Sequence, residues 1–504
     1  MQRGLAAAKA RNSAEAARWF ETAWRENPDN HQARAWLGQA LCSVGRRVEG
    51  VAHLLEAGRA FLVKARQDKN LNYILEVAGQ LQHWSEHLSA LELLQGAVEV
   101  KPEDFRGQQL LAATYAQLNK KTQAIEVGER ALALAPANQM MRVFLASLEA
   151  DAGRHASARE RLETVIAAQP NPREAFRAHK ELARVLDATG DFEQVFPHLH
   201  AAGAIATSLP EYARQDARLI PEMVKTNLAQ FDRRLMERWA GTAFSSPRPA
   251  PSFVMGFMRS GTTLTQEVLD AHPDVFVADE VELVPALKRE LHGIEKRGTS
   301  TAEKLALLDQ AGVEHLRDFY WQKVYDRFGE TIGDRVFVDK LTMNTVDVGL
   351  INCVFPDSKV IFVMRDPRDV CVSCFMQLMV PTPTTVQMLT WAGTSRFYAL
   401  VMAWWSHVSK QLTLPFLELR YENVVANFEA SYRNVFDFLG LPWDASVVDF
   451  HKRAAEKFVA TPSRTQVTKP LYASSVGRWR SYESDMATIS VSLDPFIDEF
   501  KYRQ

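Results

Sequence analysis

Prolines recur at a fixed spacing in the first third of this 504-residue chain. Pro102, Pro136 and Pro170 follow one another at intervals of 34 residues, and Pro28 precedes Pro102 by 74 residues, which is two such intervals plus six. Because proline cannot continue a helix, a proline at a fixed interval marks the end of a repeated helical unit. Such units bury their apolar faces only by stacking on neighbours, so the spacing predicts an all-α solenoid.

Other residues of the repeat support this prediction. Leu111, Ala112 and Tyr115 fall on the first helix of the unit ending at Pro136, and Ala124 and Ala131 fall on the second. A 34-residue helical pair with small residues at these places resembles the tetratricopeptide repeat (TPR). We expect a TPR solenoid over residues 1–205, irregular between about 45 and 95, with a non-repetitive helical bundle as the alternative. A TPR array offers a surface for a protein or peptide partner, although a scaffolding role remains open.

A second domain is expected after a proline-rich segment. The sequence from about 205 to 248 is charged and helical in pattern, and it ends in Ser245-Ser-Pro-Arg-Pro-Ala-Pro251. Closely spaced prolines cannot continue a helix. We therefore expect a helical linker over residues 206–250 and a second domain over residues 251–504.

Bulk composition limits the possible partners and compartments. The net charge of −2 gives no support to nucleic-acid binding, so any anion site must be a local cluster. Cys371 and Cys374 have metal or redox spacing, but no second pair accompanies them, which favours simple packing residues. The sequence lacks a signal-peptide pattern and a membrane-length apolar run, which predicts a cytoplasmic protein without a membrane span. It also lacks a cluster of metal ligands, so no metal centre is expected.

The second domain begins with a phosphate-binding pattern. Ser252–Met255 is an apolar run expected to form a buried strand, Gly256-Phe-Met-Arg-Ser-Gly-Thr-Thr263 is a glycine-bearing loop, and a helical pattern follows. A loop of this kind cradles phosphate oxygens with backbone N–H groups. Thr262 stands where nucleotide triphosphatases place a lysine, and the cation is Arg259 instead. The loop therefore suits a diphosphate-like group without a γ-phosphate.

Several segments together resemble sulfotransferases. The loop is similar to their 5′-phosphosulfate loop, and Ala271–Val275 with Ala278-Asp-Glu-Val281 resembles the tyrosylprotein sulfotransferase branch. Phe355–Asp369 resembles the 3′-phosphate segment, and the likeness covers about 250 to 480. It implies an α/β P-loop-like domain, a parallel sheet flanked by helices, that uses 3′-phosphoadenylyl sulfate (PAPS) and releases adenosine 3′,5′-bisphosphate. TPR domains in front of such domains are a bacterial arrangement.

The resemblance also implies the catalytic residues. Glu280 matches the base that takes the proton of the acceptor hydroxyl, with Asp279 and Glu282 as neighbouring competitors. Lys340 follows a short apolar strand and matches the lysine that steadies the leaving oxygen. Arg259 and Ser463 would stabilise the same oxygen.

Nucleotide-binding residues follow in the same way. Ser260, Gly261, Thr262 and Thr263 belong to the 5′ loop. Arg365, at the expected end of an apolar strand, and Ser373 match the 3′-phosphate pair, and guanidinium geometry suits that task. Arg478 matches a further 3′-phosphate cation, and Tyr421 matches a residue that lies along the nucleotide. Arg368 is interpreted as structural.

The sequence thus predicts in-line sulfuryl transfer to a hydroxyl acceptor, which could be a peptidyl tyrosine, a sugar or a small molecule. Two alternatives remain: a TPR adaptor with a non-catalytic nucleotide-binding domain, and a P-loop kinase or hydrolase. The missing lysine at position 262 disfavours the latter.

Overall fold

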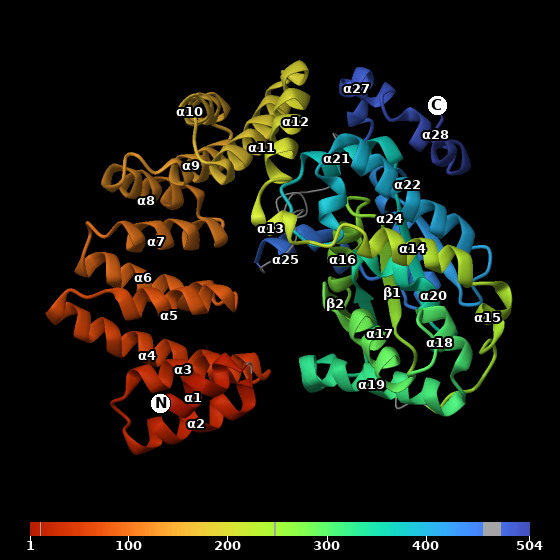
Figure 1. The fold of residues 1–504 in the computed structure, drawn as a ribbon, viewed down its shortest axis with the longest axis horizontal. Coiled ribbons are helices and arrows are strands. Elements are labelled where there is room, and N and C mark those ends of the chain that lie inside the picture. The colour runs from red at the N-terminus through yellow and green to blue at the C-terminus, as the bar shows by residue number, and fades with distance from the viewer. Residues whose placement is uncertain (11, 246–247, 457–474, 504) are drawn as a thin grey trace. The chain divides into compact units, whose positions relative to one another are not determined.

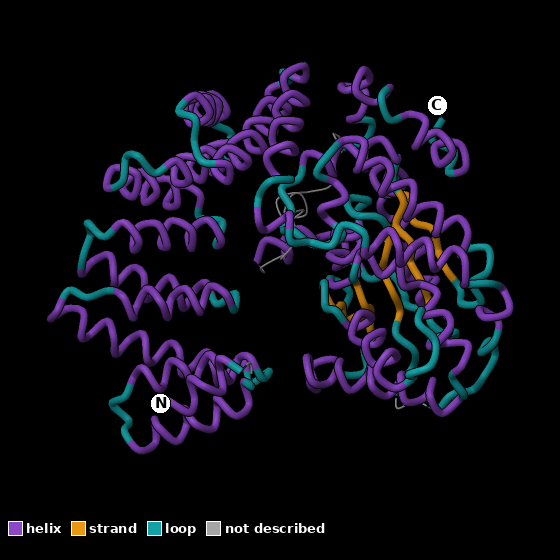
Figure 2. Tube along the Cα trace, viewed as in Figure 1, coloured by secondary structure: helices purple, strands orange, loops and turns teal. Residues whose placement is uncertain are grey.

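Packing divides the chain into two compact units, Met1–Asp191 and Phe192–Gln504. The computed structural model describes residues 1–10, 12–245, 248–456 and 475–503. Figures 1 and 2 show that the described part of the first unit consists of helices and loops, whereas the strands belong to the second unit. The expected order, an all-α solenoid before an α/β domain, is confirmed.

Helices of the first unit repeat with the period of the prolines. Helix α7 begins at Phe105 and α9 at Gln139, and their partners α8 and α10 begin at Lys121 and His155, so both offsets are 34 residues. The small residues repeat as well, because Ala112, Ala124, Ala146 and Ala158 are all fully buried between helices. The helices are α1 Gln2–Lys9, α2 Ser13–Glu26, α3 His31–Ser43, α4 Arg47–Asp68, α5 Asn72–His83, α6 His87–Val100, α7 Phe105–Gln117, α8 Lys121–Leu134, α9 Gln139–Asp151, α10 His155–Ala167 and α11 Pro172–Thr189.

The irregular region between 45 and 95 contains one long helix. Helix α4 has 22 residues, compared with 14 in each of the corresponding helices α6 and α8. This extra length explains why the interval from Pro28 to Pro102 exceeds two repeat periods.

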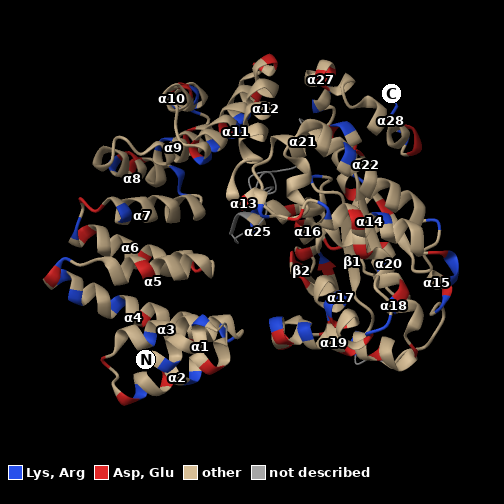
Figure 3. Ribbon diagram, viewed as in Figure 1, with Lys and Arg blue, Asp and Glu red and all other residues tan. Residues whose placement is uncertain are grey.

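Ion pairs connect successive repeats. The Arg161 guanidinium lies 2.6 Å from Glu129 on α8 and 2.8 Å from Glu149 on α9, and Arg184 lies 2.7 Å from Asp151. Charged residues of both signs are spread along the helices of the described chain (Figure 3).

A five-stranded parallel sheet forms the centre of the described second unit, with strand order β2-β3-β1-β4-β5. Every residue of the middle strand β1 is buried, as expected for a strand covered on both faces. The register places Val254 beside Lys340 on β3 and Ile361 on β4. The strands are β1 Ser252–Gly256, β2 Val275–Asp279, β3 Val336–Lys340, β4 Lys359–Met364 and β5 Phe416–Arg420.

Helices cover both faces of this sheet. Helix α21 begins with the N-cap Asp366 and Pro367, and it buries Cys371 and Cys374 as free thiols, which confirms that this pair is a packing feature. The α helices are α12 Val195–Ala206, α13 Pro210–Ala213, α14 Leu219–Gln230, α15 Arg233–Glu237, α16 Thr262–Asp270, α17 Leu283–Ile294, α18 Thr301–Leu307, α19 Gln310–Phe328, α20 Val348–Val354, α21 Pro367–Met376, α22 Trp391–Val408, α23 Tyr421–Ala426, α24 Phe428–Leu439, α25 Phe450–Glu456, α27 Glu483–Ala487 and α28 Ser490–Glu499. The 3₁₀ helices are η1 Phe192–Gln194, η2 Gly329–Ile332, η3 Thr342–Asp347, η4 Thr385–Met388, η5 Ala445–Asp449 and η6 Arg478–Tyr482.

Helices that precede the sheet in sequence pack within the second unit. Asn227 on α14 donates to the carbonyl of Val346 at 2.8 Å, and Asn352 on α20 donates to the carbonyl of Met236 on α15 at 2.9 Å. Residues 192–245 therefore form part of the support of the sheet. Among the described residues, no helix is both long enough and apolar enough to cross a membrane.

Candidate active site

The candidate residues meet at one edge of the sheet because each follows the carboxyl end of a strand. Strand β1 leads into the glycine-bearing loop, β2 into Glu280, β4 into Arg365 and β5 into Tyr421, while Lys340 is the last residue of β3. In a parallel sheet these ends lie side by side, and ligands of open α/β folds bind there. Five separate sequence segments thus converge on one place.

The loop between β1 and α16 is shaped to approach an anion. Gly261 is the N-cap of α16, adopts a left-handed conformation with φ 106°, and leaves the helix start without a side-chain cap. A Cβ atom at this position would lie 2.8 Å from the ring of Tyr421. A glycine is therefore required both by the backbone conformation and by the ring beside it. The first N–H groups of α16 point out of the helix toward this loop, which is the geometry that binds phosphate groups.

Arg259 and Arg365 join the loop to the next strand end. The Arg259 guanidinium donates through Nε to the hydroxyl of Ser373 at 2.9 Å. In the other direction, Arg365 donates to the carbonyl of Arg259 at 3.1 Å and also to the carbonyl of Ser475. Arg365 is only 8% exposed, and its Nε has no hydrogen-bond partner among the described residues. Its guanidinium lies 4.9 Å from the centre of the Tyr421 ring.

The C-terminal segment is attached to the same strand end through Asp369. The buried Asp369 carboxylate accepts from the backbone N–H groups of Gly477 and Trp479 at 2.8 and 2.9 Å, and it lies 3.8 Å from Arg365. Burial raises the pKa of Asp369, and the nearby Arg365 cation opposes the rise. Arg478, between these two residues, reaches the sulfur of Met376 on α21 at 3.1 Å. The segment that carries Arg478 is thereby held at the Arg365 strand end.

Arg368 lies apart from the loop. It pairs with Asp366 at 2.7 Å, donates to the carbonyl of Tyr502 and lies over the ring of Trp479 at 3.8 Å. These contacts attach the C-terminal residues to the start of α21.

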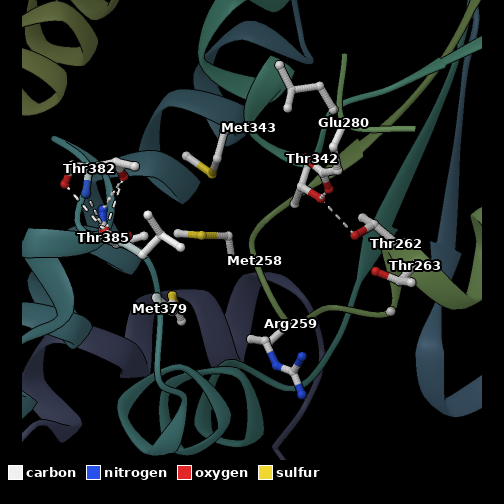
Figure 4. A pocket seen from close by; sticks show the side chains of 13 residues that line it. Met258, Arg259, Thr262, Thr263, Glu280, Thr342, Met343, Met379, Thr382 and Thr385 are labelled. Atoms are coloured by element: carbon white, nitrogen blue, oxygen red, sulfur yellow. Dashed lines mark hydrogen bonds between the residues drawn. The ribbon is translucent and has the colours of Figure 1, made fainter. Parts of the chain in front are cut away.

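Glu280 and Lys340 form a close ion pair at the ends of β2 and β3. Lys340 Nζ lies 2.5 Å from Glu280 Oε1 and 3.4 Å from Asp279 Oδ1. Lys340 is completely buried, whereas the Glu280 side chain is about one-third exposed. The Thr342 hydroxyl donates to Glu280 Oε1 at 3.3 Å and lies 2.9 Å from the Thr262 hydroxyl of the loop (Figure 4). The carboxylate, the cation and the loop are thus linked by direct contacts.

Two of these residues have left-handed backbone conformations without being glycine. Glu280 has φ 50° and Arg259 has φ 67°. Such a conformation costs about 1–2 kcal/mol for a residue with a Cβ atom. The Glu280 N–H nevertheless bonds to the carbonyl of Lys340 at 2.8 Å, so the sheet continues up to this turn. Strained backbone of this kind concentrates at functional sites.

A buried carboxyl group precedes Lys340 on β3. Asp339 is fully buried on β3 and accepts from the Tyr320 hydroxyl at 2.8 Å and from the Asn344 amide at 3.3 Å. Burial raises the pKa of Asp339 to about 7, and the two hydrogen bonds oppose the rise. Because of this raised pKa, the protonation of Asp339 makes the free energy of unfolding depend on pH.

Replacing Asp339 with asparagine is expected to change the pH dependence of stability. The pKa of this group is higher in the folded chain than in the unfolded chain, where it is about 3.9. The folded state therefore holds the proton more tightly, and the wild type loses stability as pH rises from about 4 through about 7. Asparagine does not titrate, so the variant lacks this loss of stability with rising pH. The melting temperature of Asp339→Asn minus that of the wild type should increase between pH 5 and pH 8.

The exposed Asp318 on α19 offers a matched control for this measurement. Asp318→Asn should follow the wild-type pH trend. If Asp339→Asn and the wild type show parallel trends, the pKa of Asp339 is not raised in the folded chain.

The structure brings the loop, Glu280, Lys340, Arg365, Ser373 and Tyr421 together at the same strand ends, whereas Arg368 lies apart from the loop. Ser463 lies outside the described residues, so its role stays a prediction. Sequence reasoning missed Thr342 and Asp369. Their signal is weak, because an isolated threonine or aspartate becomes a site residue only through contacts made by the fold.

Family comparisons agree with this geometry. Residues 251–445 match the model described as "Sulfotransferase family", and residues 1–60 and 145–194 match a tetratricopeptide repeat model. The second unit is therefore similar to sulfotransferases over this range. The matched range begins with β1 and runs past β5, so it includes all five strand ends described above.

Similar proteins include some that are named as sulfotransferases. The chain is 25% identical over 263 residues to protein-tyrosine sulfotransferase 1 of Danio rerio, covering 48% of this chain and 70% of that protein. It is 28% identical over 457 residues to an uncharacterized protein of Aquifex aeolicus, covering 87% of this chain but only 58% of that longer protein. Among solved structures, the sulfotransferase domain from the curacin biosynthetic pathway is 20% identical, covers 49% of this chain and 99% of that domain, and has a TM-score of 0.34.

Proposed function

We propose that this chain transfers a sulfuryl group from PAPS to the hydroxyl group of an acceptor. The observation that carries the proposal is the buried guanidinium of Arg365. Its Nε has no partner among the described residues, and it lies beside a helix start without a side-chain cap. Buried donors are normally paired, so an unpaired guanidinium donor at this place suits an anionic ligand.

The residues at this edge fit a donor with two separate anionic groups. The start of α16, with Gly261, Thr262 and Thr263, suits the 5′-phosphosulfate, and Arg259 adds a cation to the loop. Arg365 and Ser373 would hold the 3′-phosphate, with Arg478 from the attached C-terminal segment. PAPS supplies an activated sulfuryl group when it is bound.

The proposed reaction has one displacement step. The acceptor oxygen forms a bond to sulfur while Glu280 takes the hydroxyl proton. The bond between sulfur and the bridging oxygen breaks, its electron pair remains on the phosphate oxygen, and adenosine 3′,5′-bisphosphate leaves. Lys340 and Arg259 are placed to stabilise the charge that develops there, and Ser463 is proposed to assist them. The TPR unit would bind a protein or peptide partner.

Ligand-induced stabilisation tests the donor site. Adenosine 3′,5′-bisphosphate should raise the melting temperature of the second unit, because a ligand at 100 times its Kd stabilises the folded state by about 2.7 kcal/mol. ATP with magnesium should produce a much smaller increase. Arg365→Lys should lose most of the bisphosphate effect, because an ammonium group cannot replace two guanidinium donors.

The control is Arg433→Lys, since Arg433 forms an exposed ion pair with Glu429 on α24. This variant should retain the full bisphosphate effect. Preferential stabilisation by ATP with magnesium would favour a kinase or hydrolase instead. Bisphosphate binding without transfer to any acceptor would favour the non-catalytic adaptor.

A further inference from the structure

A cavity of about 340 Å³ opens beside the proposed reaction centre. One side is formed by Thr262, Glu280 and Thr342, and the other by Thr382 and Thr385 from the segment after α21 (Figure 4). The cavity also includes the loop residues Arg259, Gly261 and Thr263, so the space proposed for the acceptor is the part between Glu280 and the two threonines Thr382 and Thr385. Its volume is within the range of small-molecule sites.

Methionines dominate the space between these two sides. Met258 and Met343 lie between the two threonine groups in Figure 4, and Met379 lies near Thr385. Leu341 and Val380 add further apolar lining, and Val380 is 77% exposed. Flexible, polarizable methionine side chains suit apolar ligands of irregular shape.

Charge is scarce in this lining. Among the described residues that line the cavity, Arg259 and Glu280 carry the charges. Arg259 is proposed to face the phosphosulfate, and Glu280 already bonds to Lys340, so neither charge is assigned to the acceptor. A carboxylate on the acceptor would lose its hydration in this cavity without a dedicated cation, which is costly. An apolar body would gain about 25 cal/mol for each Å² removed from water.

Met258, Met343, Met379 and Val380 together form what we call the methionine wall. The segment that carries Met379 and Val380 is held by residues outside the matched sulfotransferase range. The Tyr212 hydroxyl on α13 donates to the carbonyl of Met379 at 3.2 Å, and Gln387 donates to the carbonyl of Ala217 at 2.5 Å. Within the wall, the Thr385 hydroxyl donates to the carbonyl of Val380 at 2.6 Å. The apolar surface is thus built in advance.

We infer that the acceptor carries its hydroxyl on an uncharged, apolar body, such as an alkyl- or aryl-substituted phenol. This inference rests on the proposed sulfuryl transfer and names its substrate class. The protein-tyrosine relatives suggest a peptidyl tyrosine as the alternative, and a tyrosine flanked by aspartates would place carboxylates against the methionine wall.

Competition between two acceptors tests the inference. The full chain is supplied with PAPS labelled in the sulfuryl group, and transfer to 4-hexylphenol is compared with transfer to a tyrosine peptide flanked by aspartates. We expect kcat/KM to be at least about 100-fold higher for the phenol, a range that one or two mismatched polar contacts can supply.

A charge placed in the wall should reverse this preference. Met343→Arg is expected to lower kcat/KM for the phenol at least about tenfold and to raise it for the acidic peptide. Met343→Leu should keep the wild-type preference. Val491→Arg, at an 88% exposed position on α28, introduces the same charge outside the cavity and should change neither value.

Stabilisation by adenosine 3′,5′-bisphosphate is measured for each variant to separate the two claims. A wild-type preference for the acidic peptide overturns the apolar acceptor but leaves the transfer reaction in place. Bisphosphate binding with no transfer to the phenol also overturns it. Absence of both bisphosphate binding and transfer contradicts the proposed function itself.

Discussion

Glu280→Ala is expected to lower the rate of sulfuryl transfer by about 10²–10⁴, the usual contribution of a positioned general base. Adenosine 3′,5′-bisphosphate should still stabilise the variant, because Glu280 lies at the end of β2 while the proposed phosphate ligands follow β1 and β4. The measurement is single-turnover transfer of labelled sulfate, together with bisphosphate-induced melting shifts.

Two further variants sharpen this result. Glu280→Gln retains the shape of the side chain and a hydrogen-bond acceptor for Lys340, so it should lose turnover with little loss of stability. Glu282→Ala removes an exposed carboxylate two residues away, whose nearest cation is 3.9 Å distant, and should remain active. Near-normal turnover in Glu280→Ala would move the proton-accepting role to Asp279 or Glu282.

Lys340→Met is the second change with a large expected effect. The ammonium group is fully buried and lies 2.5 Å from Glu280, so its removal leaves the carboxylate with Thr342 as its remaining close partner. Transfer should slow by about 10²–10³, as when a preset electrostatic contact to a developing charge is removed. The loss should fall on kcat rather than on the KM for PAPS.

Lys288→Met provides the matched comparison. Lys288 also pairs with a carboxylate, Asp347 at 2.8 Å, but it lies within α17 rather than at the end of a strand beside Glu280. This variant tests whether removal of any partly buried lysine is enough to slow transfer. A similar loss of kcat in both variants would contradict a specific role of Lys340 in the reaction.

The sequence predicted the middle of the sheet better than its edges. Strands β1, β3 and β4 are short apolar runs with mostly buried side chains, which mark strands covered on both faces. Strands β2 and β5 lie at the two edges and alternate little between buried and exposed residues. An edge strand forms because the neighbouring strand offers hydrogen-bond partners. The residue pattern of the edge strand itself therefore gives little indication that it will form.

Candidate residues were predictable where they belong to a contiguous motif. The Gly256–Thr263 loop and Arg365 are read directly from the chain, and the fold brings them into contact. The methionine wall was not predictable, because Met258, Met343 and Met379 come from three distant segments. Nothing in the sequence around Tyr212 indicates that its hydroxyl holds that wall in place.

The contacts of the last residues affect how the chain folds during synthesis. Repeats in the first unit contact mainly their neighbours, so each new helix pair can pack on the preceding repeats soon after it leaves the ribosome. In the second unit, β1 must wait for β3 and β4, and the start of α21 is completed only when the carbonyl of Tyr502 accepts from Arg368. Arg420 likewise donates to the carbonyl of Phe500 at 2.7 Å. The repeats can therefore fold during translation, whereas the second unit closes only after nearly all of its residues are made.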